Sequence, residues 1–452
     1  MAYSFTQTTA RVLARLARYQ PVRSGLQKLA VAYRQQQAMS TASPNHDIAE
    51  VLPIDPRPAV AQGGTRLNLM VPAVSQRHVF GGIETALQVF DALRPYFDQA
   101  RIIVTDEATP EPRSDAYYGA WPIVPMASES PPCDHIVAAG SRWGQTLAVH
   151  AQDHFMATAW WTAHNAFALL NWQRAQVPEA SARRLLYLIQ DYEPGFYPWS
   201  SRYLLAQATY EQPGRTIALM NSHWLADYLA AQGYAFPVKE VLQPRLHPAL
   251  AAARARCETF AKERILLVYG RPGTERNAFS LIVASLRLWA RHYPQARQWR
   301  ILSAGEAFAP IDLGSGCTLH SVGKLSIEAY ADLLCRTAVG FSLMVSPHPS
   351  YPPLEMAAFG ARVVVNRFAN KDLSGVSPLL VSASPPNPEG FSAALRTLTQ
   401  AFDHGETSCM PANASEMVWQ GGFLDSCGPG FAWAADVAAK LLGDAPAIPA
   451  TV

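Results

Sequence analysis

Short apolar segments alternate with longer amphipathic segments along most of this chain, and this alternation constrains the fold more than any other feature. One series of apolar segments ends at a proline-marked junction near 237–248, and a second series follows it. Such alternation predicts parallel β-sheets with crossover helices. We therefore predict an α/β fold with two Rossmann-like, doubly wound domains facing each other across a ligand-binding cleft. The expected strands lie at 66–71, 101–105, 135–140, 184–190, 216–222, 264–270, 299–305, 317–323, 338–344, 361–366 and 378–382.

Segments of different composition flank the two predicted domains. Residues 1–46 carry basic side chains, no acidic ones, and apolar residues at helical spacing, so we predict a basic amphipathic helical arm. Residues 47–65 are rich in proline, glycine and small polar residues and are predicted to be a linker. The domains are expected over 66–243 and 244–411. A helical tail over 412–452 is expected to return to the first domain.

Three interpretations of the basic arm are open. It can pack on the body of the protein or on a second subunit. It can also dock on an anionic membrane surface, as basic amphipathic helices do. A targeting peptide is the third alternative.

Composition and charge exclude several classes of protein. The 37 basic and 35 acidic residues give a net charge of +2, which argues against nucleic-acid binding by the whole chain. No apolar run approaches the roughly 18 residues of a membrane-spanning helix. The six cysteines form no Cys-x-x-Cys pair, so we expect neither a disulfide framework nor a zinc ribbon, and a reducing cytoplasm fits best.

Cationic residues follow two of the strands predicted in the second domain. Arg271 comes directly after the strand at 264–270, Arg276 lies near the start of the next helix, and Lys324 follows the strand at 317–323. Guanidinium groups and helix N-termini both favour anions. Taken singly, each of these residues also fits an ordinary solvated surface position.

A proline-containing loop and a helix form a third group. Ser350 and Tyr351 open this helix, and Glu355 lies one turn further on the same face as Tyr351. A carboxylate there can accept hydrogen bonds from a sugar diol, although it also stabilises the helix dipole by itself. Two cationic loops, a helix N-terminus and one carboxylate at the same edge of a sheet together suit a diphosphate attached to a ribose.

These motifs resemble the C-terminal half of family 4 glycosyltransferases, which have the GT-B fold. Arg271 takes the family's arginine position, Arg276 the place usually held by lysine, and Glu355 the helix glutamate that binds the nucleotide ribose in the family. One departure is clear: the family usually has another glutamate eight residues before the helix glutamate, where this chain has Pro347. The resemblance therefore implies a donor site but leaves the pose of the donor sugar open.

Longer motifs are most similar to bacterial rhamnosyltransferases of surface-glycan assembly, which use dTDP-rhamnose. The similar segments are 190–194, 196–200, 269–277 and 350–355. This resemblance implies a nucleotide-diphosphate sugar as donor and a glycan, lipid-linked in some cases, as acceptor. It also implies peripheral contact with the inner face of the cytoplasmic membrane.

The first domain contributes candidates for the acceptor side. A glycine pair, Gly81 and Gly82, opens a helix after the first strand, and a plain tight loop is the alternative interpretation. His164 and Tyr192 are expected at strand ends facing the cleft and are assigned to acceptor binding with Gly81. Asp191 and Glu193 are the closely spaced acids that could receive the acceptor's proton. An aromatic wall for sugar stacking, or alternatively core packing, is expected of Trp160, Trp161, Tyr197 and Trp199.

The sequence thus predicts a glycosyltransferase that moves rhamnose from dTDP-rhamnose to a growing surface glycan. The predicted catalytic residues are Asp191, Glu193, Arg271 and Lys324; the predicted donor-binding residues are Gly82, Arg271, Arg276, Lys324, Ser350, Tyr351 and Glu355. We expect no metal and no cofactor, because no Asp-x-Asp pair occurs and cationic side chains can neutralise the leaving group instead. A sugar-nucleotide epimerase and a catalytically silent glycan-binding or scaffolding subunit are the alternatives.

Overall fold

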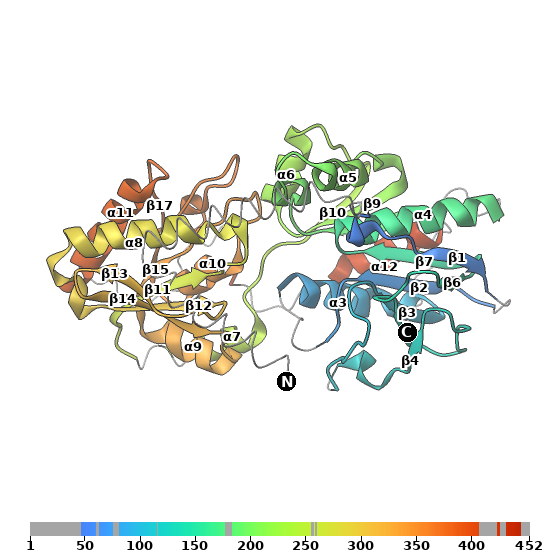
Figure 1. Cartoon of the computed structure of the whole chain (residues 1–452), viewed down its shortest axis with the longest axis horizontal. Helices are drawn as coiled ribbons and strands as arrows, with labels where there is room; N and C mark the ends of the chain where they lie inside the picture. Colours follow the sequence, from blue (N-terminus) through green and yellow to red (C-terminus); the bar gives the residue numbers. More distant parts are fainter. Residues whose placement is uncertain are drawn as a thin grey trace, which may run out of the picture. The chain divides into compact units, whose positions relative to one another are not determined.

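The computed structural model describes residues 47–59, 63–75, 81–114, 116–176, 183–254, 257, 260–405, 423–424 and 431–443 (Figure 1). The predicted basic arm at 1–46 and most of the predicted tail at 412–452 lie outside these residues. Two parallel sheets organise the described part, as the alternating pattern predicts.

The first sheet has eight strands in the order β10-β9-β8-β7-β2-β3-β5-β4, and every neighbouring pair is parallel. Its central strands are buried along their whole length, as expected when helices cover both faces of a sheet. The strands are β2 (Arg66–Val71), β3 (Gln99–Val104), β4 (Ile123–Pro125), β5 (His135–Ala138), β7 (Asp153–Ala157), β8 (Leu185–Ile189), β9 (Thr216–Met220) and β10 (Val238–Val241).

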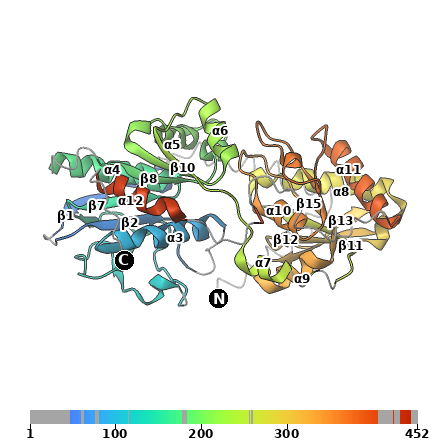
Figure 2. The same cartoon turned by 180° about the vertical axis from the view of Figure 1, so that it is seen from behind.

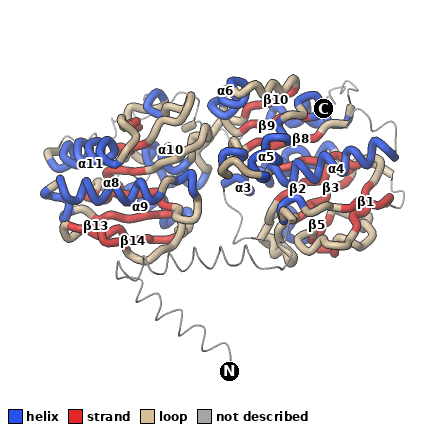
Figure 3. Tube along the Cα trace, turned by 45° about the horizontal axis from the view of Figure 1, so that its top comes forward, coloured by secondary structure: helices blue, strands red, loops and turns tan. Residues whose placement is uncertain are grey.

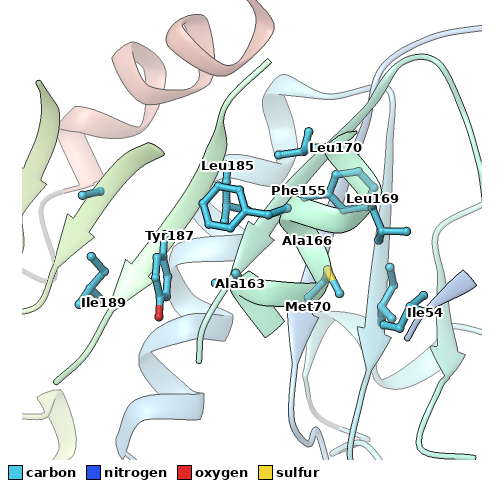
Figure 4. Close-up of a cluster of buried hydrophobic side chains, with 14 of the residues drawn as sticks. Ile54, Met70, Phe155, Ala163, Ala166, Leu169, Leu170, Leu185, Tyr187 and Ile189 are labelled. Atoms are coloured by element: carbon cyan, nitrogen blue, oxygen red, sulfur yellow. The ribbon is translucent and has the colours of Figure 1, made fainter. Parts of the chain in front are cut away.

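Helices cover both faces of this sheet. On one face, α4 (Trp160–Gln176), α5 (Ser201–Tyr210) and α6 (His223–Ala231) bury side chains against the strands. Figure 4 shows part of this core, where Ala163, Ala166 and Leu170 of α4 lie over Phe155 and Leu185. On the other face, α3 (Gly81–Leu93) and α12 (Ala434–Leu442) share one core (Figure 2).

The segment predicted as a linker contains structure. Within 47–65, β1 (Asp55–Pro58) pairs in parallel with β6 (Thr146–Val149). Ile54 is buried in the core, and its backbone N–H donates to Asn165 Oδ1 over 3.2 Å. Proline-rich composition suggested a linker, but pairing with a neighbouring strand and burial of one isoleucine hold the segment against the first domain.

The second sheet has seven strands in the order β13-β14-β12-β11-β15-β16-β17, all parallel except the edge pair β13–β14. Figure 3 labels the two strands of this edge pair, which lie side by side. Helices α8 (Phe279–His292) and α11 (Pro388–Asp403) cover one face, and α7 (Pro248–Arg254), α9 (Ile327–Arg336) and α10 (Tyr351–Ala358) cover the other. The strands are β11 (Glu263–Gly270), β12 (Arg300–Gly305), β13 (Ile311–Gly314), β14 (Cys317–Gly323), β15 (Thr337–Phe341), β16 (Arg362–Val365) and β17 (Leu380–Ser382).

A half-buried lysine connects two of these helices. Lys262 Nζ donates to the carbonyl of Leu334 near the end of α9 over 3.0 Å and to the carbonyl of Phe359 after α10 over 2.6 Å. Cations at helix C-termini satisfy carbonyl groups that the helix itself leaves open. The two helices are therefore fixed relative to each other at their C-terminal ends.

One disulfide corrects the expectation from cysteine spacing. Cys257 and Cys335 are joined although 78 residues separate them in the sequence. The absence of a Cys-x-x-Cys pair could not reveal this bond, because packing of α7 against α9 brings the two segments together. In the described part of the chain, no helix is both long enough and apolar enough to span a membrane.

Candidate functional site

The carboxyl ends of three strands in the second sheet lie side by side and bring two predicted cationic loops to one edge. Gly270 of β11 pairs with Gly305 of β12, and Ala304 of β12 pairs with Gly323 of β14. The loops that follow begin with Arg271, Glu306 and Lys324. A Cβ atom on Gly305, whose φ is +130°, would lie 2.4 Å from the Gly270 carbonyl oxygen, so only glycine fits there.

Arg271 is held by its neighbours at this edge. Its backbone N–H donates to Asn277 Oδ1 over 2.7 Å, and its Nε lies 3.3 Å from Glu306 Oε1. The other oxygen of Glu306 accepts from the Gly273 N–H over 2.7 Å. Glu306 was missed by sequence reasoning, although an acid directly after a glycine-ended strand was a visible signal. Because its carboxylate orients both the guanidinium and the loop, Glu306 belongs to the site.

Lys324 lies at the same edge, after β14. Its side chain is exposed, and partial burial of the ammonium lowers its pKa. Strand order places β14 two positions from β11, with β12 between them. The fold thus brings the Lys324 loop and the Arg271 loop to the same side of the second domain.

The loop between β15 and α10 is built from side chains that hold its backbone. Lys371 is buried, and its Nζ donates to the carbonyls of Met344 over 2.7 Å and His348 over 3.3 Å. His348 Nδ1 accepts from the N–H of Ser350, which has a φ of +65° and precedes α10. Sequence reasoning missed Lys371, because no motif or spacing marks it. It fixes the loop from which the predicted donor helix starts.

Glu355 lies on α10, one turn after Tyr351. It interacts with three tyrosines, which are Tyr330, Tyr351 and Tyr269. The hydroxyl of Tyr330 on α9 donates to Glu355 Oε2 over 3.0 Å. Burial raises the pKa of Glu355 to about 7, while the hydrogen bond from Tyr330 opposes that rise. Burial, together with Glu355, also raises the pKa of Tyr351 to about 12.

Tyr269 connects Glu355 with Arg271. Burial raises the pKa of Tyr269; the Glu355 carboxylate raises it further, whereas Arg271 and its hydrogen bond lower it. Both charged groups therefore act on the same phenol. Tyr269, near the end of β11, thus lies within electrostatic reach of both Arg271 and Glu355.

Asp191 follows β8 in the first domain and contacts residues of the second. One oxygen, Oδ1, accepts from the Tyr192 N–H over 2.8 Å and from the Ser346 hydroxyl. The other, Oδ2, lies 3.3 Å from Arg276 Nε, and the Arg276 guanidinium covers the ring of Phe196 at 4.2 Å. A carboxylate of one domain is thus paired with a cation and a hydroxyl of the other.

Glu193 is buried, like Asp191. The hydroxyl of Tyr187 donates to Glu193 Oε2 over 3.1 Å, and the Glu193 N–H donates to the Tyr210 hydroxyl over 3.3 Å. Burial raises the pKa of Glu193 to about 8, and the nearby Asp191 carboxylate adds to the rise. Burial therefore favours the protonated form of the Glu193 carboxyl at neutral pH.

The remaining site residues predicted in the first domain lie on different elements. Gly82 lies in the first turn of α3, where a Cβ atom would come 2.6 Å from Gln190 Oε1, and Gly81 has a φ of +26°. Tyr192 packs among other tyrosines, and its hydroxyl is 3.4 Å from that of Tyr203. His164 was expected at a strand end, but it lies in the second turn of α4, and burial lowers its pKa.

Three of the four predicted wall aromatics pack together, because the rings of Trp161 and Tyr197 each lie edge-on to the ring of Trp160. Trp160 is fully buried and donates from Nε1 to the Tyr197 hydroxyl over 3.0 Å, whereas Trp199 is 93% exposed. A small pocket is present elsewhere, bounded by Trp224, Leu354 and Phe423. None of the predicted site residues lines this pocket.

Comparison with known proteins shows what the two domains are. Residues 66–223 match the domain described as WsaF, N-terminal domain, and residues 264–396 match WsaF, C-terminal domain. The chain carries both WsaF glycosyltransferase domains, in that order.

A relative and two solved structures add to this assignment. The chain is 29% identical over 366 residues to the O-antigen biosynthesis protein RfbC of Myxococcus xanthus, and the match covers 77% of this chain but only 25% of RfbC. It thus spans about a quarter of that relative's length. The fold is similar to trehalose-6-phosphate synthase OtsA, with a TM-score of 0.50 and 11% identity over 85% of this chain and all of OtsA. The apo structure of OtsA matches with the same TM-score over 84% of this chain. Two Rossmann-like domains in the GT-B arrangement are therefore established, as the sequence predicted.

Proposed function

We propose that this WsaF-domain protein transfers rhamnose from dTDP-rhamnose to a growing surface glycan. The family match, the similarity to the O-antigen biosynthesis protein RfbC and the sequence motifs that resemble those of rhamnosyltransferases support the proposal. The observation that carries it is the edge of the second sheet where Arg271 and Lys324 follow β11 and β14, with β12 between these strands. Cations at this edge suit a diphosphate, and Glu355 of α10 supplies a carboxylate for pentose hydroxyls.

In this proposal the second domain binds the donor. Arg271, Arg276 and Lys324 neutralise the diphosphate, and the N-terminal end of α10 adds the backbone N–H of Tyr351. Ser350, whose own N–H donates to His348, contributes its hydroxyl. Glu355 accepts a hydrogen bond from the pentose. On the first domain, Gly82 allows close approach to the donor, and Gly81, His164 and Tyr192 are proposed to bind the acceptor.

The transfer step breaks one bond and forms another at the anomeric carbon. The acceptor hydroxyl oxygen bonds to this carbon, while the bond to the diphosphate oxygen breaks and its electron pair leaves with dTDP. Arg271 and Lys324 stabilise the charge that develops on the leaving group. The hydroxyl proton passes to the Asp191 carboxylate, and Glu193, which is protonated and hydrogen-bonded to Tyr187, positions that loop.

We propose that the reaction needs no bound metal ion or cofactor, because arginine and lysine can supply the positive charge that a divalent cation would supply. Turnover should therefore be the same in excess EDTA as in its absence. Loss of turnover in EDTA, restored by magnesium or manganese, would show that a metal neutralises the diphosphate.

We also propose that the protein works at the inner face of the cytoplasmic membrane and that the basic segment 1–46 binds anionic lipid. Vesicles of phosphatidylglycerol and phosphatidylcholine should sediment the full chain but not a chain lacking these residues. Neutral phosphatidylcholine vesicles serve as the control. Equal sedimentation of both chains would place any membrane contact elsewhere.

The deciding experiment separates three functions with one set of incubations. The protein is incubated with dTDP-rhamnose, with and without a rhamnose-containing oligosaccharide acceptor, and dTDP, free rhamnose and isomerised donor are measured. Acceptor-dependent dTDP release supports the transferase. Net isomerisation of the donor without an acceptor supports the alternative of an epimerase. Tight dTDP binding without turnover on any acceptor supports a silent glycan-binding subunit.

A further inference from the structure

One oxygen of the Glu355 carboxylate already accepts a hydrogen bond from within the protein. Its Oε2 accepts a hydrogen bond from the Tyr330 hydroxyl over 3.0 Å, and no other side chain of the described residues donates to this carboxylate. Burial, with Glu355 adding to it, raises the pKa of Tyr330, so the phenol stays protonated and remains a donor. The opposite oxygen, Oε1, is the one left for a ligand.

The two helices cannot easily separate to release this contact. Tyr330 lies on α9, whose first turn is capped by Ser326, and Glu355 lies on α10. Lys262 donates to carbonyls at the ends of both helices, Leu334 and Phe359. The distance between phenol and carboxylate is therefore set by the fold, as in other pre-organised sites.

The geometry points to Tyr330 as the residue that makes the donor site prefer 2′-deoxyribose over ribose, an inference that rests on the proposed nucleotide-sugar function. A ribose presents two neighbouring hydroxyls, and a carboxylate holds such a diol best when each hydroxyl donates to a different oxygen. A 2′-deoxyribose presents only the 3′-hydroxyl, which Oε1 can accept while Tyr330 keeps Oε2. The 2′-hydroxyl of a ribonucleotide must instead share Oε2 with the phenol or share Oε1 with the 3′-hydroxyl, and an acceptor shared between two donors gives each a weaker hydrogen bond.

Three nucleotides test this inference without any mutation. Isothermal titration compares UDP, dUDP and dTDP: dUDP differs from UDP only at the 2′-position, and dTDP differs from dUDP only at the base methyl group. We expect dUDP to bind about tenfold more tightly than UDP, which corresponds to about 1.4 kcal/mol. Equal binding of UDP and dUDP would overturn the inference, whatever the effect of the methyl group.

One substitution tests the residue itself. Tyr330→Phe removes the hydroxyl and frees Oε2, so the preference for dUDP over UDP should fall to within about twofold, chiefly through tighter UDP binding. Tyr96→Phe, an exposed tyrosine of the first domain, is the matched control and should keep the wild-type ratio. A wild-type ratio in folded Tyr330→Phe protein would contradict the role of Tyr330. If none of the three nucleotides binds the wild-type chain, the proposed function fails first, and the result is distinct from unselective binding.

Discussion

Arg276 of the second domain and Asp191 of the first form an ion pair, with 3.3 Å between Arg276 Nε and Asp191 Oδ2. The hydroxyl of Ser346 donates to the other oxygen of the same carboxylate. Asp191, the acid proposed to receive the acceptor's proton, therefore contacts Arg276, which is proposed to bind the donor. In the proposed mechanism, this contact places proton transfer next to the leaving group.

Replacing Asp191 with asparagine should lower kcat by roughly 10²–10⁴-fold, because the amide keeps the shape but cannot accept the proton. The measurement is acceptor-dependent release of dTDP at saturating donor and acceptor. Asp227→Asn, at an exposed position of α6, is the matched control and should leave kcat unchanged. If Asp191→Asn turned over within twofold of wild type, another group would have to take the proton.

Replacing Arg271 with alanine should lower kcat by roughly 10²–10³-fold, the usual effect of losing one pre-organised charge on a leaving group. Arg271→Lys should recover part of the loss, since the charge returns without the guanidinium geometry that Glu306 orients. Arg287→Ala, an exposed arginine on α8 of the same domain, is the control. Unchanged turnover in folded Arg271→Ala protein would remove the central element of the proposed donor site.

Donor affinity should rise with pH through neutrality, because burial raises the pKa of Glu355 to about 7. Below that pH the carboxyl is mostly protonated and accepts hydrogen bonds poorly; above it the carboxylate forms. For one group with this pKa, the ionised fraction grows about tenfold between pH 6 and pH 8, and the affinity for dTDP-rhamnose should follow. dTDP-rhamnose is the suitable probe, since esterification at the terminal phosphate removes its second ionisation.

Glu355→Gln provides the control for this pH effect. The amide does not titrate, so the variant should bind dTDP-rhamnose weakly and with the same affinity at pH 6 and pH 8. A slope that survives in Glu355→Gln would assign the titration to a different group, such as Glu193, whose pKa burial raises to about 8.

Protonation of Glu355 weakens donor binding but stabilises the folded chain. Glu355 has a higher pKa in the folded chain than its ordinary 4.5, so the folded state holds the proton more tightly than the unfolded state. Its contribution to stability is full below about pH 4.5 and decreases as the pH rises to about 7. Stronger donor binding at higher pH is thus accompanied by a less stable ligand-free site.

Most strands could be predicted from the sequence because their apolar runs are continuous. The run at 66–71 coincides with β2 (Arg66–Val71), and the run at 317–323 coincides with β14 (Cys317–Gly323). The central strand β7 (Asp153–Ala157) was missed because it begins with Asp153 and His154. That aspartate is acceptable in a buried strand only because Arg66 and Arg101 pair with it, a contact between residues far apart in sequence.

Residues of the candidate site could be predicted from the sequence only where a charged side chain directly follows a strand. Arg271 and Lys324 stand immediately after glycine-ended strands, so position alone marked them. Lys371 and the role of Tyr330 could not be derived in this way. Lys371 reaches back across the edge of the sheet to carbonyls more than 20 residues away, and Tyr330 faces Glu355 from another helix. Such contacts follow from tertiary packing, which local spacing does not encode.

Stability should depend on an ion cluster at the amino end of the first sheet, away from the proposed site. Asp153 is fully buried; its Oδ1 accepts from Arg66 Nε over 2.6 Å, and its Oδ2 lies 3.3 Å from an Arg101 nitrogen. Although burial opposes ionisation, these two arginines hold the pKa of Asp153 well below its usual range. Its contribution to stability is therefore present above the ordinary aspartate pKa of 3.8 and is lost only in strong acid.

Asp153→Asn should lower the free energy of unfolding by about 3–5 kcal/mol, because two buried guanidiniums lose their counter-charge. Urea unfolding at pH 7, followed by circular dichroism, gives the value, and the exposed Asp227→Asn substitution should change it by less than about 0.5 kcal/mol. dTDP binding by the fraction that remains folded should be unchanged, since the cluster and the proposed donor site lie in different domains. A loss below 1 kcal/mol would mean that water reaches the arginines once the carboxylate is gone.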